Sequence, residues 1–345
     1  MKIILISPFQ LSLNRGIERF SYSLANELAH QGNKVIVYTW RSKSNVNWGA
    51  WHKDIKLRQV PRFKYYIRLF APLYYRKWLK KDAPDVILLN FLYHGEQKLP
   101  PFYRYLYVLN SPASQVPHRY DFIKKHLQSF PNMSFVAVSK MVAREAKSYI
   151  NNRKIKVIPN GVDTTKFIPV TVNRTEEPIK LVTASAFEER KGIQYIIKAI
   201  AQYPSLDIIY DIYGAGDYEL QLKKIIKEHN LDKKVKINSP VNNIEIILPL
   251  YDVFCLPSKG EAFALAPIEA LSCGVPILVS KHPPYDELVK GDYGICVDEH
   301  SPNDIIKAIR DLIKVKRTAP ETIRSAAIPY DWKNIAKQYL EAIES

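Results

Sequence analysis

The chain has 345 residues, of which 47% are hydrophobic, so we expect a packed protein that is long enough for two domains of ordinary size. Its formal charge of +16 is uneven, because residues 1–170 hold 28 Lys and Arg against 9 Asp and Glu, a charge of +19, and the remainder holds 22 against 25. A negatively charged partner is therefore expected to meet the N-terminal half.

Several classes of protein do not fit this composition. Cys255, Cys273 and Cys296 are isolated in apolar surroundings, which argues against a disulfide framework or a metal cluster and favours a reducing cytoplasm. The apolar part of "MKIILISPFQ" is too short for a signal peptide, and no run approaches the roughly 20 apolar residues that span a bilayer.

The first half alternates apolar runs typical of strands with helical patterns. A strand at 2–7 precedes a helix that begins at Gly16 and ends before Gly32, where a C-cap glycine belongs. Further strands are predicted at 34–39, 85–90, 105–110, 135–139 and 156–161. Strands that alternate with helices predict a parallel sheet with helices on both faces.

The same pattern restarts after a linker at 159–178 that is rich in Pro, Asn and Thr. The second series has predicted strands at 179–185, 206–214, 234–238, 253–258 and 276–280. The sequence thus predicts an α/β protein with two doubly wound, Rossmann-like domains joined near residue 170. Ligands of such sheets bind at the carboxyl ends of the strands, so a cleft between the domains is the expected site.

Two carboxylates, Glu261 and Glu269, flank an uncharged run in "KGEAFALAPIEALSCGVPILVS". We expect Glu261 in a loop after a strand, and Glu269 in the first turn of a helix that starts near Pro267. The N–H groups of residues 263–268 would then form an anion site at the helix N-terminus. On spacing alone, a loop Glu and a first-turn Glu are ordinary surface features.

The flanking sequence makes the match specific. "LPSKGEAFALAPIEALSCGVPIL" resembles the E-x7-E block of retaining glycosyltransferases of family 4. Other blocks of that family follow the same order, namely "RGIERFSYSLANELAHQGNKVIVYT", "VSKMVAREA", "VIPNGVDTTKF", "FEERKGIQYIIKAI" and "YDWKNIAKQYLEAIES". The resemblance covers nearly the whole chain.

The resemblance implies the two-domain GT-B fold. Its expected parts are an acceptor-binding domain at 1–168, a nucleotide-sugar domain at 169–328, and a helix at 329–345 that returns to the first domain. It also implies a hexosyltransferase that uses a nucleotide diphosphate sugar, with a UDP-linked sugar favoured, and neither a cofactor nor a metal.

The resemblance assigns roles to the donor side. Glu261 would contact the transferred sugar, Glu269 the ribose hydroxyls, and the basic pair Arg190 and Lys191 the diphosphate. Fixed cations favour the transition state because the leaving group gains negative charge as the glycosidic bond breaks. The remaining residues expected around the donor phosphates are Gly16, Phe263, Ala264, Leu265 and Ala266.

The chain departs from the family in three places. Arg15 stands where the first loop usually has glycine, and Ala264 where many members have glycine. Asn110 and Ser111 stand near the position where many members carry a histidine. We take Asn110, Ser111 and His94 as the acceptor-side candidates.

Residues 56–81 contain nine Lys or Arg and seven aromatic residues, with no acid. Such a segment suits an anionic membrane surface, single-stranded nucleic acid, or a helix with buried rings and solvated cations. We favour the membrane, which predicts a cytoplasmic enzyme on the inner face and no nucleic-acid partner.

The expected function is transfer of a sugar to a glycan or glycolipid acceptor at the membrane, as in cell-surface polysaccharide or lipopolysaccharide synthesis. Two alternatives within the same fold are a nucleotide-sugar epimerase and a glycogen-synthase-like polymerase. Outside the enzymes, the charge of the first half alone favours a basic nucleic-acid-binding protein.

Overall fold

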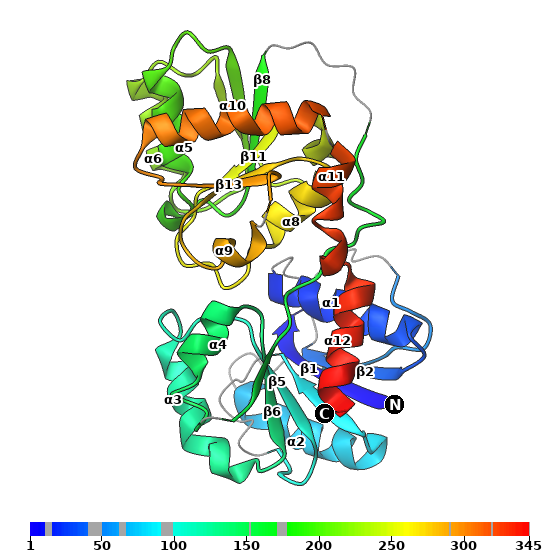
Figure 1. Cartoon of the computed structure of the whole chain (residues 1–345). Coiled ribbons are helices and arrows are strands. Elements are labelled where there is room, and N and C mark those ends of the chain that lie inside the picture. The colour runs from blue at the N-terminus through cyan, green and yellow to red at the C-terminus, as the bar shows by residue number, and fades with distance from the viewer. Residues whose placement is uncertain are drawn as a thin grey trace. The chain divides into compact units, whose positions relative to one another are not determined.

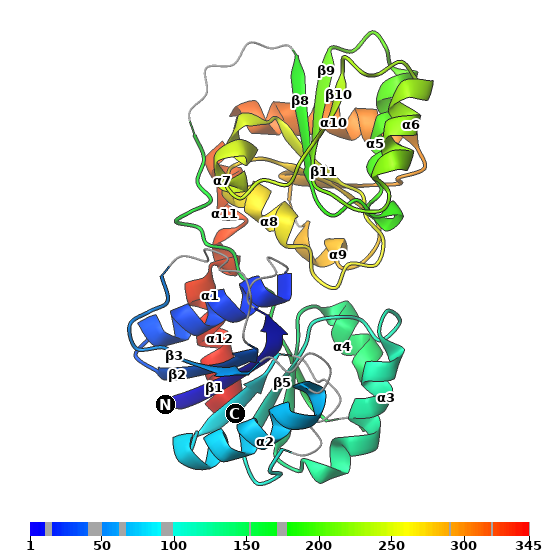
Figure 2. The same cartoon turned by 180° about the vertical axis from the view of Figure 1, so that it is seen from behind.

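The computed structural model describes residues 1–10, 16–40, 50–61, 67–90, 99–151, 153–170, 178–289, 291–318 and 320–344. The chain forms two compact units, one of Met1–Gly161 with Trp332–Ser345 and one of Val162–Asp331. Each unit is a parallel sheet flanked by helices (Figures 1 and 2). The prediction of two doubly wound α/β domains is confirmed.

The sheet of the first unit, as far as the structure describes it, has the strand order β3-β2-β1-β4-β5-β6-β7. These strands are β1 (Lys2–Gln10), β2 (Lys34–Trp40), β3 (Lys56–Val60), β4 (Val86–Leu89), β5 (Tyr105–Leu109), β6 (Met133–Ala137) and β7 (Ile155–Val157). All neighbouring strands pair in parallel. The first strand, β1, lies inside the sheet, with β2 and β3 on one side of it and β4 to β7 on the other.

The helices of the first unit bury one apolar stripe each. They are α1 (Gly16–His30), α2 (Ile67–Asp82), α3 (Pro117–His126), α4 (Lys140–Ala146) and α12 (Trp332–Glu344). Helix α1 buries Phe20, whose ring lies 5.7 Å from that of Trp332 and 5.9 Å from that of Tyr339. The last helix therefore packs on the first one, and the chain crosses between the units twice (Figure 1).

The sheet of the second unit has the order β10-β9-β8-β11-β12-β13 among its described strands. They are β8 (Ile179–Ala184), β9 (Ile208–Tyr213), β10 (Val235–Asn238), β11 (Val253–Leu256), β12 (Ile277–Ser280) and β13 (Gly294–Val297). Its α-helices are α5 (Ile193–Gln202), α6 (Glu219–Glu228), α7 (Ile244–Ile247), α8 (Leu265–Ser272), α9 (Tyr285–Leu288), α10 (Pro302–Thr318) and α11 (Pro320–Ser325). The parallel pairing puts the loops after β11, β12 and β13 at one edge.

The boundaries between the units differ from the expected ones. Residues 162–168, expected in the first domain, and 329–331, expected with the closing helix, both belong to the second unit. The reason is packing, because Phe167 lies in a core cluster of the second unit and Val162 N–H donates to Tyr330 O at 2.8 Å.

Segment 56–81 forms β3 and α2, apart from residues outside the described ranges. Tyr75 stacks on Tyr38 with ring centres 5.8 Å apart, and Trp78 lies edge-on to Tyr38 at 5.2 Å. The Arg58 guanidinium lies 5.7 Å from the Trp78 ring centre and forms an ion pair with Asp82. The exposed cations of α2 are Arg76, Lys77, Lys80 and Lys81. The described rings of Tyr75 and Trp78 thus pack on the first unit. This agrees with the third possibility for segment 56–81, a helix with buried rings and solvated cations.

No described helix is both long and apolar enough to cross a membrane.

Candidate functional site

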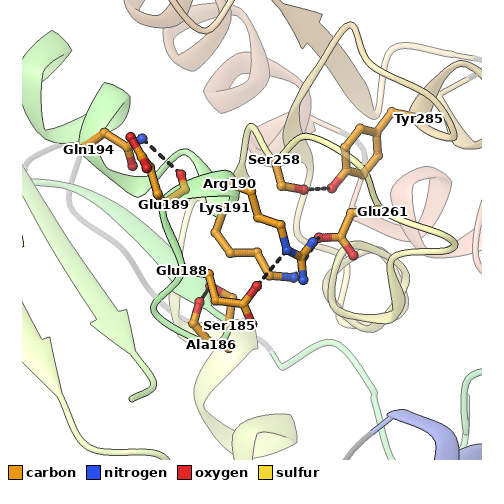
Figure 3. Close-up of polar contacts among 10 residues, drawn as sticks. All are labelled: Ser185, Ala186, Glu188, Glu189, Arg190, Lys191, Gln194, Ser258, Glu261 and Tyr285. Carbon is orange, nitrogen blue, oxygen red and sulfur yellow. Dashed lines mark hydrogen bonds and ion pairs between the residues drawn. The ribbon is translucent and has the colours of Figure 1, made fainter. Parts of the chain in front are cut away.

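The short 3-10 helix η3 (Glu189–Lys191) lies against the loop that follows β11 (Figure 3). Gly192 ends η3 with φ 74°, and a Cβ added there would lie 2.2 Å from Pro257 O. Only glycine allows this approach. The backbone of Lys259 then donates to Arg190 O at 2.8 Å, which fixes the loop beside the two cations.

The carboxylate of Glu261 lies between the predicted cations. Its Oε1 accepts hydrogen bonds from Lys191 Nζ at 2.6 Å and from Arg190 Nη1 at 2.9 Å. Arg190 Nε donates to Glu188 Oε2 at 2.6 Å (Figure 3). The Glu261 and Lys191 side chains are each 13% exposed, whereas Arg190 is 41% exposed. The structure therefore joins the three residues that the sequence predicts to be catalytic.

The charges of this cluster shift the ionisation of its members. Burial opposes the ionised form of Glu261, but the charges and hydrogen bonds of Lys191 and Arg190 outweigh it and lower the pKa of the carboxyl. Burial likewise opposes the charge on Arg190, yet the carboxylates of Glu261 and Glu188 raise the pKa of its guanidinium. Both pKa shifts favour the charged form, that is, the carboxylate of Glu261 and the guanidinium ion of Arg190.

Helix α8 presents its N-terminus without a side-chain cap. Its N-cap residue is Ala264, with φ −86° and ψ 110°, and no side-chain hydrogen bond caps the helix. The methyl group causes no strain, because any L-residue adopts these angles. Ala264 is 6% exposed, and Phe263, Leu265 and Ala266 are partly exposed. The uncapped N–H groups of this turn can donate hydrogen bonds to an anion.

Glu269 does not lie in the first helical turn, so that expectation is wrong. Helix α8 starts at Leu265, so Pro267 lies in the first turn as expected, but Glu269 is the fifth helical residue. Its side chain is partly buried. The predicted ribose contact would therefore come from the second turn of the helix.

The acceptor-side candidates in the described residues lie in the first unit. Asn110 follows β5 and donates from Nδ2 to Asn90 O at 3.1 Å and to Asn90 Oδ1 at 3.0 Å. Its own Oδ1 is buried and has no hydrogen-bond partner among the described residues. Ser111 O accepts a hydrogen bond from Tyr120, and Gly16 is the exposed first residue of α1. His94 and Arg15 lie outside the described residues.

A buried carboxylate that the sequence analysis did not select joins three neighbouring loops. Glu299 follows β13 and is 5% exposed, and its Oε1 lies 3.0 Å from Lys259 Nζ and 2.9 Å from His282 Nε2. Burial raises its pKa, but the hydrogen bonds from His282 and Lys259 outweigh that effect and lower the pKa to about 2. Glu299 thus anchors the loop of Lys259, two residues from Glu261. No motif in "VDEHSP" marks it.

Among the described side chains, no group of three or more His, Cys, Asp or Glu is placed to hold a metal ion.

The fold and this cluster place the chain in a class of enzymes. Sucrose-phosphate synthase from Thermosynechococcus elongatus superposes with a TM-score of 0.81 at 19% identity, over 99% of this chain and 98% of that one. HepE from Anabaena in complex with UDP and glucose gives a TM-score of 0.77 at 19% identity, over 100% of both chains. These likenesses show that the chain has the GT-B fold of glycosyltransferases.

The sequence families agree with that fold. Glycosyltransferase Family 4 matches residues 14–166, and Glycosyl transferases group 1 matches residues 165–328. The chain therefore belongs to the group 1 glycosyltransferases of family 4 type and is a glycosyltransferase.

Curated relatives match over different shares of the chain. A phosphatidylinositol N-acetylglucosaminyltransferase subunit from Arabidopsis thaliana is 23% identical over 98% of this chain and 80% of the relative. The putative colanic acid biosynthesis glycosyltransferase WcaL from Escherichia coli K12 is 30% identical over 40% of this chain and 37% of the relative.

Proposed function

We propose that the chain is a retaining, metal-independent glycosyltransferase that moves a hexose from a UDP-sugar to a glycan or glycolipid at the membrane surface. Such a reaction belongs to the synthesis of cell-surface polysaccharide or lipopolysaccharide. The observation that carries the proposal is the cluster that Arg190 and Lys191 of η3 form with Glu261, which lies in the loop that leads to the uncapped N-terminus of α8.

The donor diphosphate would bind where two positive features are available. Lys191 and Arg190 supply full charges, and the first turn of α8 supplies N–H groups. Glu261 accepts one hydrogen bond from each cation, which leaves other N–H groups of Lys191 and Arg190 to bind the phosphates. The carboxylate of Glu261 would then turn to the sugar hydroxyls. Both cations are held in advance, which lowers the reorganisation needed when the leaving group becomes charged.

The proposed step keeps the anomeric configuration. The bond from the anomeric carbon to the diphosphate breaks, and its electron pair goes to the departing oxygen. The acceptor oxygen bonds to the same carbon from the same face, and its proton passes to a phosphate oxygen of the leaving group. Lys191 and Arg190 would stabilise the negative charge that develops on that group.

The choice of UDP and of a lipid-linked or polymeric acceptor rests on several observations. The structural neighbour HepE was solved with UDP and glucose, one curated relative is named for phosphatidylinositol and another for colanic acid. The first half of the chain carries +19, which would attract an anionic acceptor or surface. The unpartnered buried Oδ1 of Asn110 could accept a hydrogen bond from an acceptor hydroxyl.

The test measures the rate at which labelled sugar is transferred from UDP-hexoses to glycan acceptors dispersed in phospholipid, in the presence of EDTA. Glu261→Ala should abolish most of the transfer, whereas Glu228→Ala, an exposed position of α6, should leave it unchanged. Product NMR should show the donor's anomeric configuration. Near-normal transfer by Glu261→Ala, or an inverted product, would reject the proposal.

A further inference from the structure

A cavity of about 600 Å³ lies along the outer flank of the first unit, where α4 faces the described edge strand β7. Its lining consists of Lys140, Ala143, Arg144, Lys147, Arg153, Lys154, Ile155 and Val157. We call it the α4–β7 pocket. Its volume is in the range of small-molecule sites.

The pocket concentrates positive charge from two directions. Lys140, Arg144 and Lys147 follow one another at spacings of four and three residues, so they share one face of α4 and its extension. Lys154 approaches from the segment just before β7. These four residues are exposed, and like charges at such spacings destabilise a helix, so packing alone gives no reason for this arrangement.

Among the residues that the structure describes, the lining holds five cationic residues and no carboxylate. Glu145, the one acid within α4, is directed elsewhere, because its carboxylate accepts hydrogen bonds from Ser114 N at 2.8 Å and from Ser114 Oγ at 3.2 Å. The net charge of the described lining is therefore positive.

Arg153 gives the pocket one rigid cation. Its Nη1 donates to Phe130 O at 2.8 Å and to Met133 O at 3.1 Å, and its Nη2 donates to Leu127 O at 3.2 Å. These partners are carbonyl groups, which orient the guanidinium without cancelling its charge. Ala143, Ile155 and Val157 provide a small apolar floor beside it.

We propose that the α4–β7 pocket binds a phosphate-bearing ligand, with Arg144, Lys147 and Lys154 as the contacts and Arg153 as the fixed charge behind them. Phosphate oxygens satisfy several cationic donors at once and remove the repulsion among them. The apolar floor suits a ligand whose phosphate is esterified to an organic group. The same chemistry is offered by a phospholipid headgroup and by a soluble phosphate. The pocket lies in the first unit and its assignment is independent of the donor site.

The experiment measures binding of two probes by four altered proteins and the wild type. The probes are inorganic pyrophosphate, followed by calorimetry, and phosphatidylcholine vesicles containing phosphatidylglycerol, followed by co-sedimentation at two salt concentrations. The test variants are Arg144→Ala/Lys147→Ala and, from the other wall, Lys154→Ala. The matched control is Lys227→Ala/Lys233→Ala, which removes the same charge from exposed positions of the second unit.

We expect the double pocket variant to bind at least one probe about tenfold or more weakly, and Lys154→Ala to show a smaller loss in the same probe. The control should bind as the wild type does. If the pocket variants lose binding to vesicles alone, the ligand is a lipid headgroup. If they lose binding to pyrophosphate alone, the ligand is a soluble phosphate. Equal binding by wild type and pocket variants in both arms, or equal losses in the control, would overturn the proposal. Lys191→Ala, measured in parallel, identifies pyrophosphate bound at the donor site.

Discussion

The two units arrange positive charge in opposite ways. In the second unit, Lys191 and Arg190 are hydrogen-bonded to Glu261, and Lys259 is bonded to Glu299. In the first unit, the described lining of the α4–β7 pocket contains five cationic residues and no carboxylate. The cations of the second unit are held in one geometry before a ligand binds. Most cations of the α4–β7 pocket are exposed side chains, which a ligand would have to order.

This difference predicts opposite consequences of removing charge. Loss of a paired charge leaves a partly buried partner without its counter-ion, which lowers stability and disturbs the site. Loss of a charge from the pocket removes repulsion, so it should weaken ligand binding and change stability only slightly. Four predictions test this contrast.

The largest effect is expected for Lys191→Ala. We expect the turnover number to fall by about 10²–10³-fold, because Lys191 is the most buried cation at the proposed diphosphate position. Steady-state transfer kinetics measure this change. The control is Lys198→Ala, an exposed lysine on the following helix, which should keep wild-type kinetics. A loss of less than threefold would show that Lys191 does not face the leaving group.

Glu261→Gln should lower the free energy of unfolding by about 1–3 kcal/mol at pH 7, because two charge-assisted hydrogen bonds are weakened. The folded pKa of Glu261 lies below its ordinary value of 4.5, so its stabilisation is present above that pH and lost below it. The difference between variant and wild type in urea unfolding should therefore shrink as pH falls below about 4.5. A difference that persists unchanged into acid would mean that the ion pairs do not form.

Glu299→Gln should cost less, about 1 kcal/mol, because Lys259 and His282 are both more than 40% exposed. Its folded pKa of about 2 against 4.5 places the loss of stabilisation between those two values as pH falls. Thermal unfolding from pH 7 to pH 2 measures this, with Glu228→Gln, an exposed helix position, as control. If both variants behave alike, the proposed anchoring of the three loops is wrong.

The smallest effect is expected for Arg144→Ala/Lys147→Ala on stability. The free energy of unfolding should change by only a few tenths of a kcal/mol, because the repulsion between these two cations and their favourable position at the C-terminal end of α4 oppose each other. Urea unfolding at low and high salt measures this change. Marked destabilisation would mean that these cations serve the fold and not a ligand.

Much of the architecture could be predicted from the sequence, because the spacing of apolar residues and the glycines and prolines at the ends of elements reflect local physics. The helix that ends before Gly32 and most predicted strands lie where the alternation placed them. Strands β3 and β13 were not predicted. Strand β3 is an edge strand with mostly exposed side chains inside a segment dominated by cations. Strand β13 offers a run of only three apolar residues after Gly294.

The site could be predicted in part. A motif supplied Glu261, Arg190 and Lys191, but their mutual contact joins residues about 70 positions apart and depends on how β8 and β11 pair. Glu299 carries no motif, since its role arises only where three loops of the sheet converge. The α4–β7 pocket also needed the structure, because its lining comes from two segments that lie on either side of a turn.

The most direct test of the donor site is thermal unfolding in the presence of UDP. A ligand at about 100 times its dissociation constant stabilises the folded protein by about 2.7 kcal/mol, so UDP should raise the melting temperature of the wild type and of Lys198→Ala by several degrees. Lys191→Ala should show little or no shift. An equal shift in Lys191→Ala, or none in the wild type with UDP while another nucleotide diphosphate gives one, would contradict the account.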